Sequence, residues 1–353
     1  MRFSEVLDIR NGRNQRQVEN KNGKYPIYGS GGIMGRADDF LCEAETVVIG
    51  RKGSINNPIY VDEPFWNVDT AFGLVAHKDV LLPKYLYYFC VNFDFEKLNT
   101  TVTIPSLTKA NLLQIEISIP DMDKQRYIVG VLDRVCHLIE LRQRELRELD
   151  QLVKSRFIEL FIGKGYPTKT VDEVSLGKGE YGAQSASIKY DPTRPRYVRI
   201  TDINDDGTLN DDVVASINPD DDEQYRLEYG DFMFARMGAT VGKTYAFITG
   251  NQIFAGYLIR YKLNQKLINP RYLFWYTRLD EYWNWVKLNQ SGAAQPGINA
   301  KKYGSLRIPV PPIEQQEQFA TFVEQTDKSK LAIQQSLDKL ETLKKSLMQE
   351  YFG

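Results

Sequence analysis

The second half of this chain repeats the first, and this repeat constrains the fold more than any other feature of the sequence. Residues 99–161 align without a gap with residues 290–352, at a constant offset of 191 positions. Upstream, the string Arg51-Lys52-Gly53-Ser54 matches Arg236-Met237-Gly238-Ala239 at an offset of 185. Two copies are too few for a solenoid. The sequence therefore predicts a pseudo-symmetric molecule with two similar binding surfaces.

The composition is that of an ordinary globular protein of two or three domains. The chain has 353 residues, of which 42% are hydrophobic and 26% charged,. No apolar run approaches the roughly 18 residues of a membrane span, and residues 1–5 do not form a signal-peptide core. The three cysteines are widely spaced, which fits a reducing compartment,. We therefore expect a cytoplasmic protein with no membrane segment.

Neither metal chemistry nor bulk charge explains what the chain does. It has two histidines, and no Cys/His cluster has the spacing of metal ligands,. The formal net charge is −1, which weighs against binding nucleic acid by overall charge alone,. Local basic patches remain compatible with that balance. We expect no bound cofactor and no metal.

The first part of each repeat predicts mixed α and β structure. Runs of β-branched and aromatic residues predict short strands at residues 46–49, 58–61, 232–235 and 244–248,. Aromatic-rich helices are expected at residues 82–89 and 269–276. Core packing explains their rings better than stacking on a ligand does.

The second part of each repeat predicts a long helix with a coiled-coil seam. After Pro120, apolar residues recur at alternating spacings of 4 and 3, interrupted at Arg142 and Arg156: Ile128, Leu132, Val135, Ile139, Leu146, Leu149, Val153 and Leu160,. The second copy, interrupted at Lys330 and Lys344, has Phe319, Val323, Ile333, Leu337, Leu340, Leu347 and Tyr351. Each helix has roughly 38 residues and a length of about 57 Å. One such helix cannot bury its seam alone, so we expect the two copies to pair.

Two strings approach nucleotide-handling motifs and then depart from them. The string from Gly238 to Thr244 has three residues between its glycines, whereas a P-loop needs four, and a strand follows it,. A tight turn between strands is the better interpretation. Asn56-Asn57-Pro58-Ile59-Tyr60 has Ile59 where an amino-methyltransferase motif needs a second proline,. No glycine-rich turn for a methyl donor accompanies it.

The repeated arginine before a glycine, Arg51 and Arg236, is the most suggestive polar feature. Arginine suits bidentate contact with guanine or phosphate, although a structural salt bridge beneath a turn explains it equally well. Neighbouring donors and the loops before the long helices complete the candidate DNA-contacting set: Arg51, Lys52, Ser54, Asn56, Asn57, Thr101, Thr103, Arg236, Thr240, Lys243, Ser291 and Gln295. These are also ordinary loop residues.

The plan of mixed domain and long helix, used twice, resembles the DNA specificity subunit of type I restriction–modification systems over essentially the whole chain. The strings that carry the resemblance are Tyr25-Pro26-Ile27-Tyr28-Gly29-Ser30-Gly31-Gly32-Ile33, Arg236-x-Gly238-Ala239-Thr240-Val241-Gly242-Lys243, Ile117-Ser118-Ile119-Pro120-x-x-x-x-Gln125, and Ile308-Pro309-Val310-Pro311-Pro312-Ile313-Glu314-Gln315-Gln316. The last is the strongest. The first copy departs from the string that begins at Arg236. Its counterpart from Arg51 to Asn56 lacks the Gly-Lys pair that Gly242 and Lys243 form in the second copy.

The resemblance implies an α+β fold with two mixed α/β target recognition domains and two long helices that pair as an antiparallel coiled coil. The implied boundaries are residues 1–120 for the first domain, 121–165 for the first helix and linker, 166–311 for the second domain, and 312–353 for the second helix. Each domain would read one half of a bipartite, asymmetric site without catalysis, while the helices set the spacing. The implied partners are double-stranded DNA, methyltransferase subunits that dock on the helices, and restriction (motor) subunits.

Two other classes of protein compete with this interpretation. A stand-alone DNA methyltransferase or nuclease is disfavoured by the missing methyl-donor motif and by the absence of a repeated catalytic arrangement. A coiled-coil scaffold that binds no DNA is disfavoured by the dissimilar loops on a shared frame, because a scaffold has no use for divergent turns.

Overall fold

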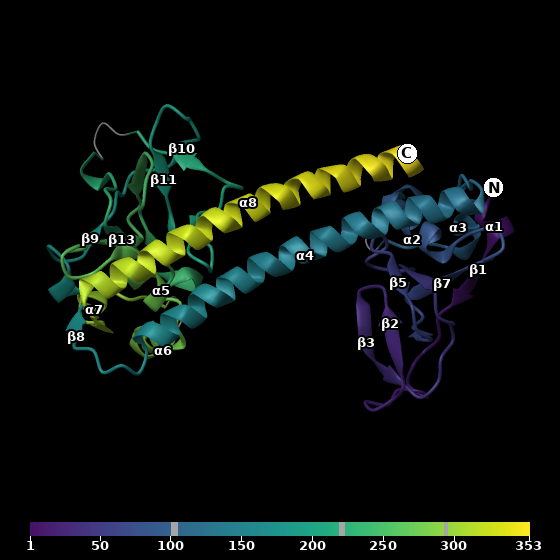
Figure 1. Cartoon of the computed structure of the whole chain (residues 1–353), viewed down its shortest axis with the longest axis horizontal. Helices are drawn as coiled ribbons and strands as arrows, with labels where there is room; N and C mark the ends of the chain where they lie inside the picture. Colours follow the sequence, from purple (N-terminus) through teal and green to yellow (C-terminus); the bar gives the residue numbers. More distant parts are fainter. Residues whose placement is uncertain (100–104, 219–222, 293–295) are drawn as a thin grey trace. The chain divides into compact units, whose positions relative to one another are not determined.

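The computed structural model describes residues 1–99, 105–218, 223–292 and 296–353, and these form two compact units. Unit 1 comprises Met1–Arg144 with Ile333–Gly353, and unit 2 comprises Glu145–Ala332. Two 40-residue helices, α4 (Met122–Phe161) and α8 (Ile313–Phe352), each continue from one unit into the other (Figure 1). Each unit therefore contains one mixed domain and a half of each long helix.

Unit 1 is built on a four-stranded antiparallel sheet with the order β1-β7-β4-β5. A second sheet has the order β3-β2-β6. The elements of its mixed domain are α1 (Phe3–Val6), β1 (Leu7–Asn11), β2 (Tyr25–Gly29), β3 (Gly32–Ala37), β4 (Thr46–Gly50), β5 (Ile59–Val61), β6 (Trp66–Asn67), β7 (Ala71–Ala76), α2 (Pro83–Asn92), the 3-10 helix η1 (Phe95–Leu98) and α3 (Lys109–Leu112).

Unit 2 has sheets of order β14-β13-β16-β9 and β10-β12-β11-β15, and a β17-β8 pair. Its strands are β8 (Thr168–Thr170), β9 (Glu180–Tyr181), β10 (Ile188–Lys189), β11 (Arg196–Val198), β12 (Ala215–Ser216), β13 (Asp231–Ala235), β14 (Thr244–Ala246), β15 (Gln252–Phe254), β16 (Leu258–Lys262) and β17 (Arg307–Pro309). Its helices are α5 (Pro270–Tyr276), α6 (Asp280–Asn289), α7 (Ala300–Gly304) and the 3-10 helices η2 (Asp172–Val174), η3 (Ile200–Asp202), η4 (Glu223–Tyr225) and η5 (Gly238–Thr240).

The repeat in the sequence is a repeat in sheet topology. The antiparallel order β9-β16-β13-β14 in unit 2 corresponds to β1-β7-β4-β5 in unit 1. The four predicted strands are present as β4, β5, β13 and β14, although β5 and β14 are shorter than predicted. The two aromatic helices are α2 and α5, and their rings lie in the cores or pack against them, with Phe274 and Trp275 of α5 only partly buried.

The apolar seams of α4 and α8 pack together, and the two helices run antiparallel. In unit 2 the ring of Phe319 lies 5.3 Å from that of Phe157 and 5.6 Å from that of Phe161. Further along, Lys330 of α8 pairs with Asp150 of α4. Residue numbers therefore increase along α8 in the direction in which they decrease along α4. The seam also contains Phe157, which lies between the predicted positions Val153 and Leu160, and Phe161, which directly follows Leu160. The predicted α+β class with an antiparallel helix pair is confirmed, whereas the domain boundaries at residues 120 and 311 stay a prediction.

A buried glutamine joins each mixed domain to the start of its long helix. Gln125 and Gln316 are both 0% exposed, although glutamine is polar. The side-chain oxygen of Gln316 accepts from the Asn269 amide at 2.9 Å, and its nitrogen donates to the carbonyls of Leu267 and Pro311 at 3.1 and 2.8 Å. Gln125 makes the same three bonds in unit 1. The glutamine therefore satisfies backbone groups that the helix entrance would otherwise leave unpaired.

None of the helices in the described part of the chain combines the length and the apolar character that a bilayer span requires.

Candidate nucleic-acid interface

In unit 1 the turn that carries Arg51 is hydrogen-bonded to the loop that precedes α3. The Gly53 amide donates to the Pro105 carbonyl at 3.1 Å, and the Leu107 amide donates to the Arg51 carbonyl at 2.9 Å. The Arg51 amide donates in turn to the carbonyl of Thr70 at 2.8 Å. Two segments that lie far apart in the sequence are thus joined. We call residues 51–54 with residues 105–107 the turn–loop corner of unit 1.

Unit 2 contains the same corner at the repeated positions. The Gly238 amide donates to the Pro296 carbonyl at 2.9 Å, and the Ile298 amide donates to the Arg236 carbonyl at 2.9 Å. The Arg236 amide donates to the Tyr257 carbonyl at 3.0 Å. Residues 236–240 with residues 296–298 form the turn–loop corner of unit 2. The backbone frame is therefore shared between the units, while the side chains mounted on it differ.

The glycine of each corner is required by its backbone conformation. Gly53 has φ +82° and Gly238 has φ +70°, in the left-handed region that residues with a side chain rarely adopt,. The space where a Cβ would stand at Gly238 has no atom within 4 Å. The glycine therefore sets the direction of the chain, and the space beside the arginine stays open. The string from Gly238 to Thr244 is a 3-10 turn followed by strand β14, as predicted, and not a P-loop.

Arg236 is held by an aromatic ring. Its guanidinium carbon lies 4.7 Å from the ring centroid of Tyr181, a cation–π arrangement,. The Tyr181 hydroxyl accepts from the Ala300 amide at 3.2 Å, which ties the ring to the start of α7. The guanidinium of Arg236 has no ion pair with the residues that the structure describes. No hydrogen bond or ion pair to another described residue engages its N–H donors, so among these residues they remain able to meet an external acceptor.

Arg51 is more loosely held than its counterpart. It is exposed, and its guanidinium carbon lies 5.7 Å from the ring centroid of Phe72. Its Nη1 makes a long contact of 3.5 Å with the Asp69 carbonyl. Over the described ranges neither arginine forms a salt bridge, so the alternative of a structural ion pair beneath the turn does not describe them.

The other candidates in unit 1 divide into exposed and internally engaged side chains. Lys52, Ser54 and Asn57 are exposed on the surface of this region. Asn56 is engaged, because its Oδ1 accepts from the Phe95 amide at 2.7 Å and its Nδ2 donates to Asp94 at 3.2 Å. The side chain of Asn56 thus holds the start of η1.

The additional candidates in unit 2 are largely engaged within the fold. The hydroxyl of Thr240 donates to the Met237 carbonyl at 3.1 Å, which closes the turn. Lys243 donates to the Ile203 carbonyl at 3.1 Å and pairs with Asp205 at 2.8 Å. The hydrogen bond from Lys243 lowers the pKa of the Asp205 carboxyl. These two side chains stabilise the corner and the loop beside it.

The last four candidate DNA-contacting residues lie in the loops before the long helices. Ser291 is exposed and its backbone pairs with Gly297 in both directions, at 3.0 and 2.9 Å. Thr101, Thr103 and Gln295 lie outside the described residues. Sequence reasoning missed Tyr181, which lies 55 positions before Arg236 in a two-residue strand. No local pattern marks it, because only the pairing of β9 with β16 brings it to the corner.

The comparison with protein families decides between the classes of protein considered above. The model described as "Type I restriction modification DNA specificity domain" matches residues 1–151 and again residues 168–344. The chain belongs to this family. The double match coincides with the internal repeat, and it supports a specificity subunit over the alternative of a stand-alone methyltransferase or nuclease. As a member of the family, the chain is a DNA-recognition subunit and is not itself an enzyme.

Relatives that match over most of both chains agree with the family assignment. The specificity subunit is 24% identical to a protein of Haemophilus influenzae named as a type I restriction enzyme specificity subunit, over 93% of this chain and 88% of that protein. It is 19% identical to the EcoDI specificity subunit of Escherichia coli, over 99% and 86% of the two chains. The crystal structure of the S subunit from M. genitalium matches with a TM-score of 0.68 at 15% identity, covering 100% of this chain and 95% of that chain. That likeness concerns the fold alone.

Proposed function

We propose that each turn–loop corner of this specificity subunit contacts one half of a bipartite, asymmetric DNA site. The long helices set the separation of the two halves and dock the methyltransferase subunits, and restriction (motor) subunits complete the assembly. The observation that carries the proposal is the shared backbone frame of the two corners, on which the polar side chains differ. A shared frame with different donors suits two domains that read different sequences in the same manner.

Arg51 and Arg236 are the proposed base- or phosphate-contacting groups. Arginine presents N–H donors in a fixed fork that matches the two acceptors on the edge of guanine. The stack on Tyr181 restricts the guanidinium of Arg236 to few orientations, so less conformational entropy is lost on binding,. Lys52, Ser54 and Asn57 are further donors beside the corner of unit 1. The near-neutral charge of the chain leaves much of the phosphate contact to its partners,.

The first prediction is that Arg51→Ala and Arg236→Ala each weaken specific DNA binding by the assembled complex. A lost bidentate base contact costs about 1–3 kcal/mol, equivalent to roughly 5- to 150-fold in affinity. The two substitutions should relax discrimination at opposite halves of the site. Competition binding with DNA mutated in one half at a time measures this.

The matched control is Arg307→Ala, which removes the same charge from strand β17, where Arg307 bonds to Thr168 within the protein. We expect little change in sequence discrimination in that variant. Wild-type binding by both corner variants, with the fold intact by circular dichroism, would refute the assignment of the two arginines.

A second prediction concerns catalysis. Because the chain has no methyl-donor motif, the purified protein alone should transfer no methyl group from labelled S-adenosylmethionine to duplex DNA. Incorporation above a no-protein control in a filter-binding assay would contradict the proposal of a pure reader. Addition of methyltransferase subunits should produce transfer that depends on both corners.

A further inference from the structure

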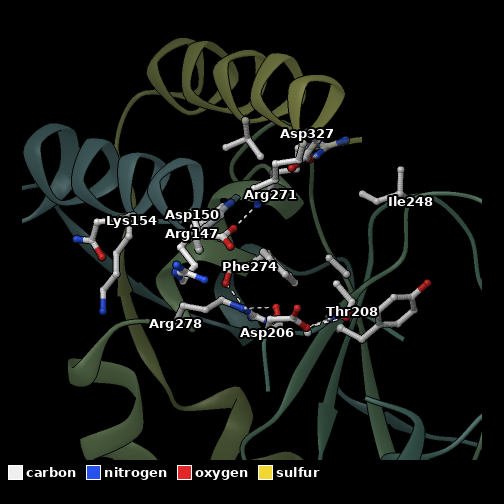
Figure 2. A pocket seen from close by; sticks show the side chains of 17 residues that line it. Arg147, Asp150, Lys154, Asp206, Thr208, Ile248, Arg271, Phe274, Arg278 and Asp327 are labelled. Atoms are coloured by element: carbon white, nitrogen blue, oxygen red, sulfur yellow. Dashed lines mark hydrogen bonds and ion pairs between the residues drawn. The ribbon is translucent and has the colours of Figure 1, made fainter. Parts of the chain in front are cut away.

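Unit 2 contains a cavity of about 650 Å³ that is separate from its turn–loop corner (Figure 2). This volume lies within the roughly 300–1,000 Å³ of small-molecule sites. The walls come from the end of α4, the start of α8, helix α5, strand β14 and the loop at residues 206–208. None of the corner residues lines it. The proposed DNA contacts therefore leave this cavity unexplained.

One part of the cavity is apolar and partly aromatic. Phe274 and Trp275 of α5, Ile248 and Ala246 at the end of β14, and Val323 of α8 line it. Apolar walls with a few convergent polar groups are the usual composition of a pocket for a small organic ligand. These walls suit a flat apolar body.

The charged part of the cavity has an excess of cations. Five basic side chains line it, against three carboxylates: Arg147, Lys154, Arg271, Arg278 and Lys330, with Asp150, Asp206 and Asp327. Lys330 pairs with Asp150, and Arg271 pairs with Asp327 at 3.1 Å. Within the described part of the chain, Arg147 and Lys154 have no ion pair. They lie seven positions apart on α4, so they share one face of the helix.

Arg278 adds a partly buried positive charge, which lies near the carboxylate of Asp206. Its nitrogens donate to the carbonyls of Asp206, Phe274 and Thr244 and to the hydroxyls of Thr244 and Thr277. Burial lowers the pKa of Arg278 to about 10, so the group stays protonated at neutral pH. An anion in the cavity would add to the negative charge near Arg278 without displacing any of these hydrogen bonds.

Figure 2 shows Arg147 and Lys154 on the α4 side of the cavity. We propose that the cavity binds a nucleoside phosphate, with the base against the apolar wall of Trp275 and Ile248 and the phosphate toward Arg147 and Lys154. Cationic side chains would hold the phosphate, since no glycine-rich loop lines the cavity. Binding through partly exposed cations weakens as salt screens them.

The test is calorimetric titration of the full purified chain with ADP, and separately with adenosine and with inorganic phosphate, at matched ionic strength. ADP should bind at least 10-fold more tightly than either part, because only ADP engages both walls. Absence of ADP binding at millimolar concentration overturns the proposal. Equal binding of ADP and inorganic phosphate overturns it as well, because the apolar wall would then contribute nothing.

Substitutions on α4 locate the site. Arg147→Gln and Lys154→Gln should each lower the affinity for ADP at least 5-fold, while circular dichroism shows unchanged helix content. Lys328→Gln is the matched control, because Lys328 is an exposed lysine on α8 that does not line the cavity. Unchanged affinity in the α4 variants, or an equal loss in the control, refutes a specific site.

Nucleotide binding in the cavity does not depend on DNA reading by the corners, so separate variants test each. Arg236→Ala should keep wild-type affinity for ADP, because Arg236 does not line the cavity. Loss of ADP binding in that variant would place the nucleotide at the corner and overturn the cavity as its site.

Discussion

Replacement of Gln316 by leucine should lower the free energy of unfolding by about 3–5 kcal/mol. The substitution leaves the Asn269 amide and the carbonyls of Leu267 and Pro311 without their partner in a site that water does not reach. Each buried polar group left unsatisfied costs about 1–3 kcal/mol. Leucine is close to glutamine in size, so a cavity contributes little to the loss. Urea denaturation followed by circular dichroism measures the effect.

The repeat provides an internal duplicate of this experiment. Gln125→Leu should cost a similar amount, because Gln125 bonds to Leu82, Val80 and Pro120 in the same way. Gln318→Leu is the control, since Gln318 is exposed two positions further along α8. A loss below about 1 kcal/mol in both buried variants would show that the helix entrances tolerate unpaired groups. A loss in the control equal to theirs would show that the effect does not come from burial.

Exchange of the first mixed domain should change one half of the recognised DNA sequence and leave the other half intact. Specific sites bind about 10³- to 10⁷-fold more tightly than non-specific DNA. A complex carrying the exchanged domain should therefore lose nearly all preference for the old half-site and gain a new one. Mapping methylated adenines across the genome of a host that carries the complex reads out both halves at once.

The structure specifies which residues an exchange of residues 1–120 must retain. Tyr85 and Phe89 of α2 pack on Phe352 of α8, with ring centroids 5.0 and 6.3 Å apart. Lys84 and Tyr88 contact Asp133 of α4, each at 2.7 Å. A donor domain that keeps these four side chains of α2 should fold on the recipient helices.

A donor domain that lacks those side chains is the control for the exchange. The complex that carries such a domain should lose DNA binding because the domain is less stable, and not because its sequence specificity has changed. A lowered temperature of thermal unfolding distinguishes the first cause from the second. If a stably folded exchange changed both halves of the recognised sequence together, one composite surface would read the site, and the division between the two corners would be wrong.

Much of this architecture follows from local and repetitive features of the sequence. Apolar residues at spacings of 4 and 3 predict the seams of α4 and α8, because side chains at that spacing share one face of a helix. The matching strings occur in the same order in both halves of the chain, which predicts two copies of one fold. The structure contains two sheets with the same strand order, one in each unit. The Arg-x-Gly strings predict turns, because glycine alone adopts the required backbone conformation readily.

The partners of individual side chains were decided only by the tertiary structure. Asn56 and Lys243 have the chemistry of DNA contacts, yet the fold uses their side chains for Asp94 and Asp205. Tyr181 carries no sequence signal, yet sheet pairing brings it to Arg236. The reason is physical. Periodicity and turn chemistry act over a few residues, whereas a side chain's partner depends on which distant segments the sheets and the helix pair bring together.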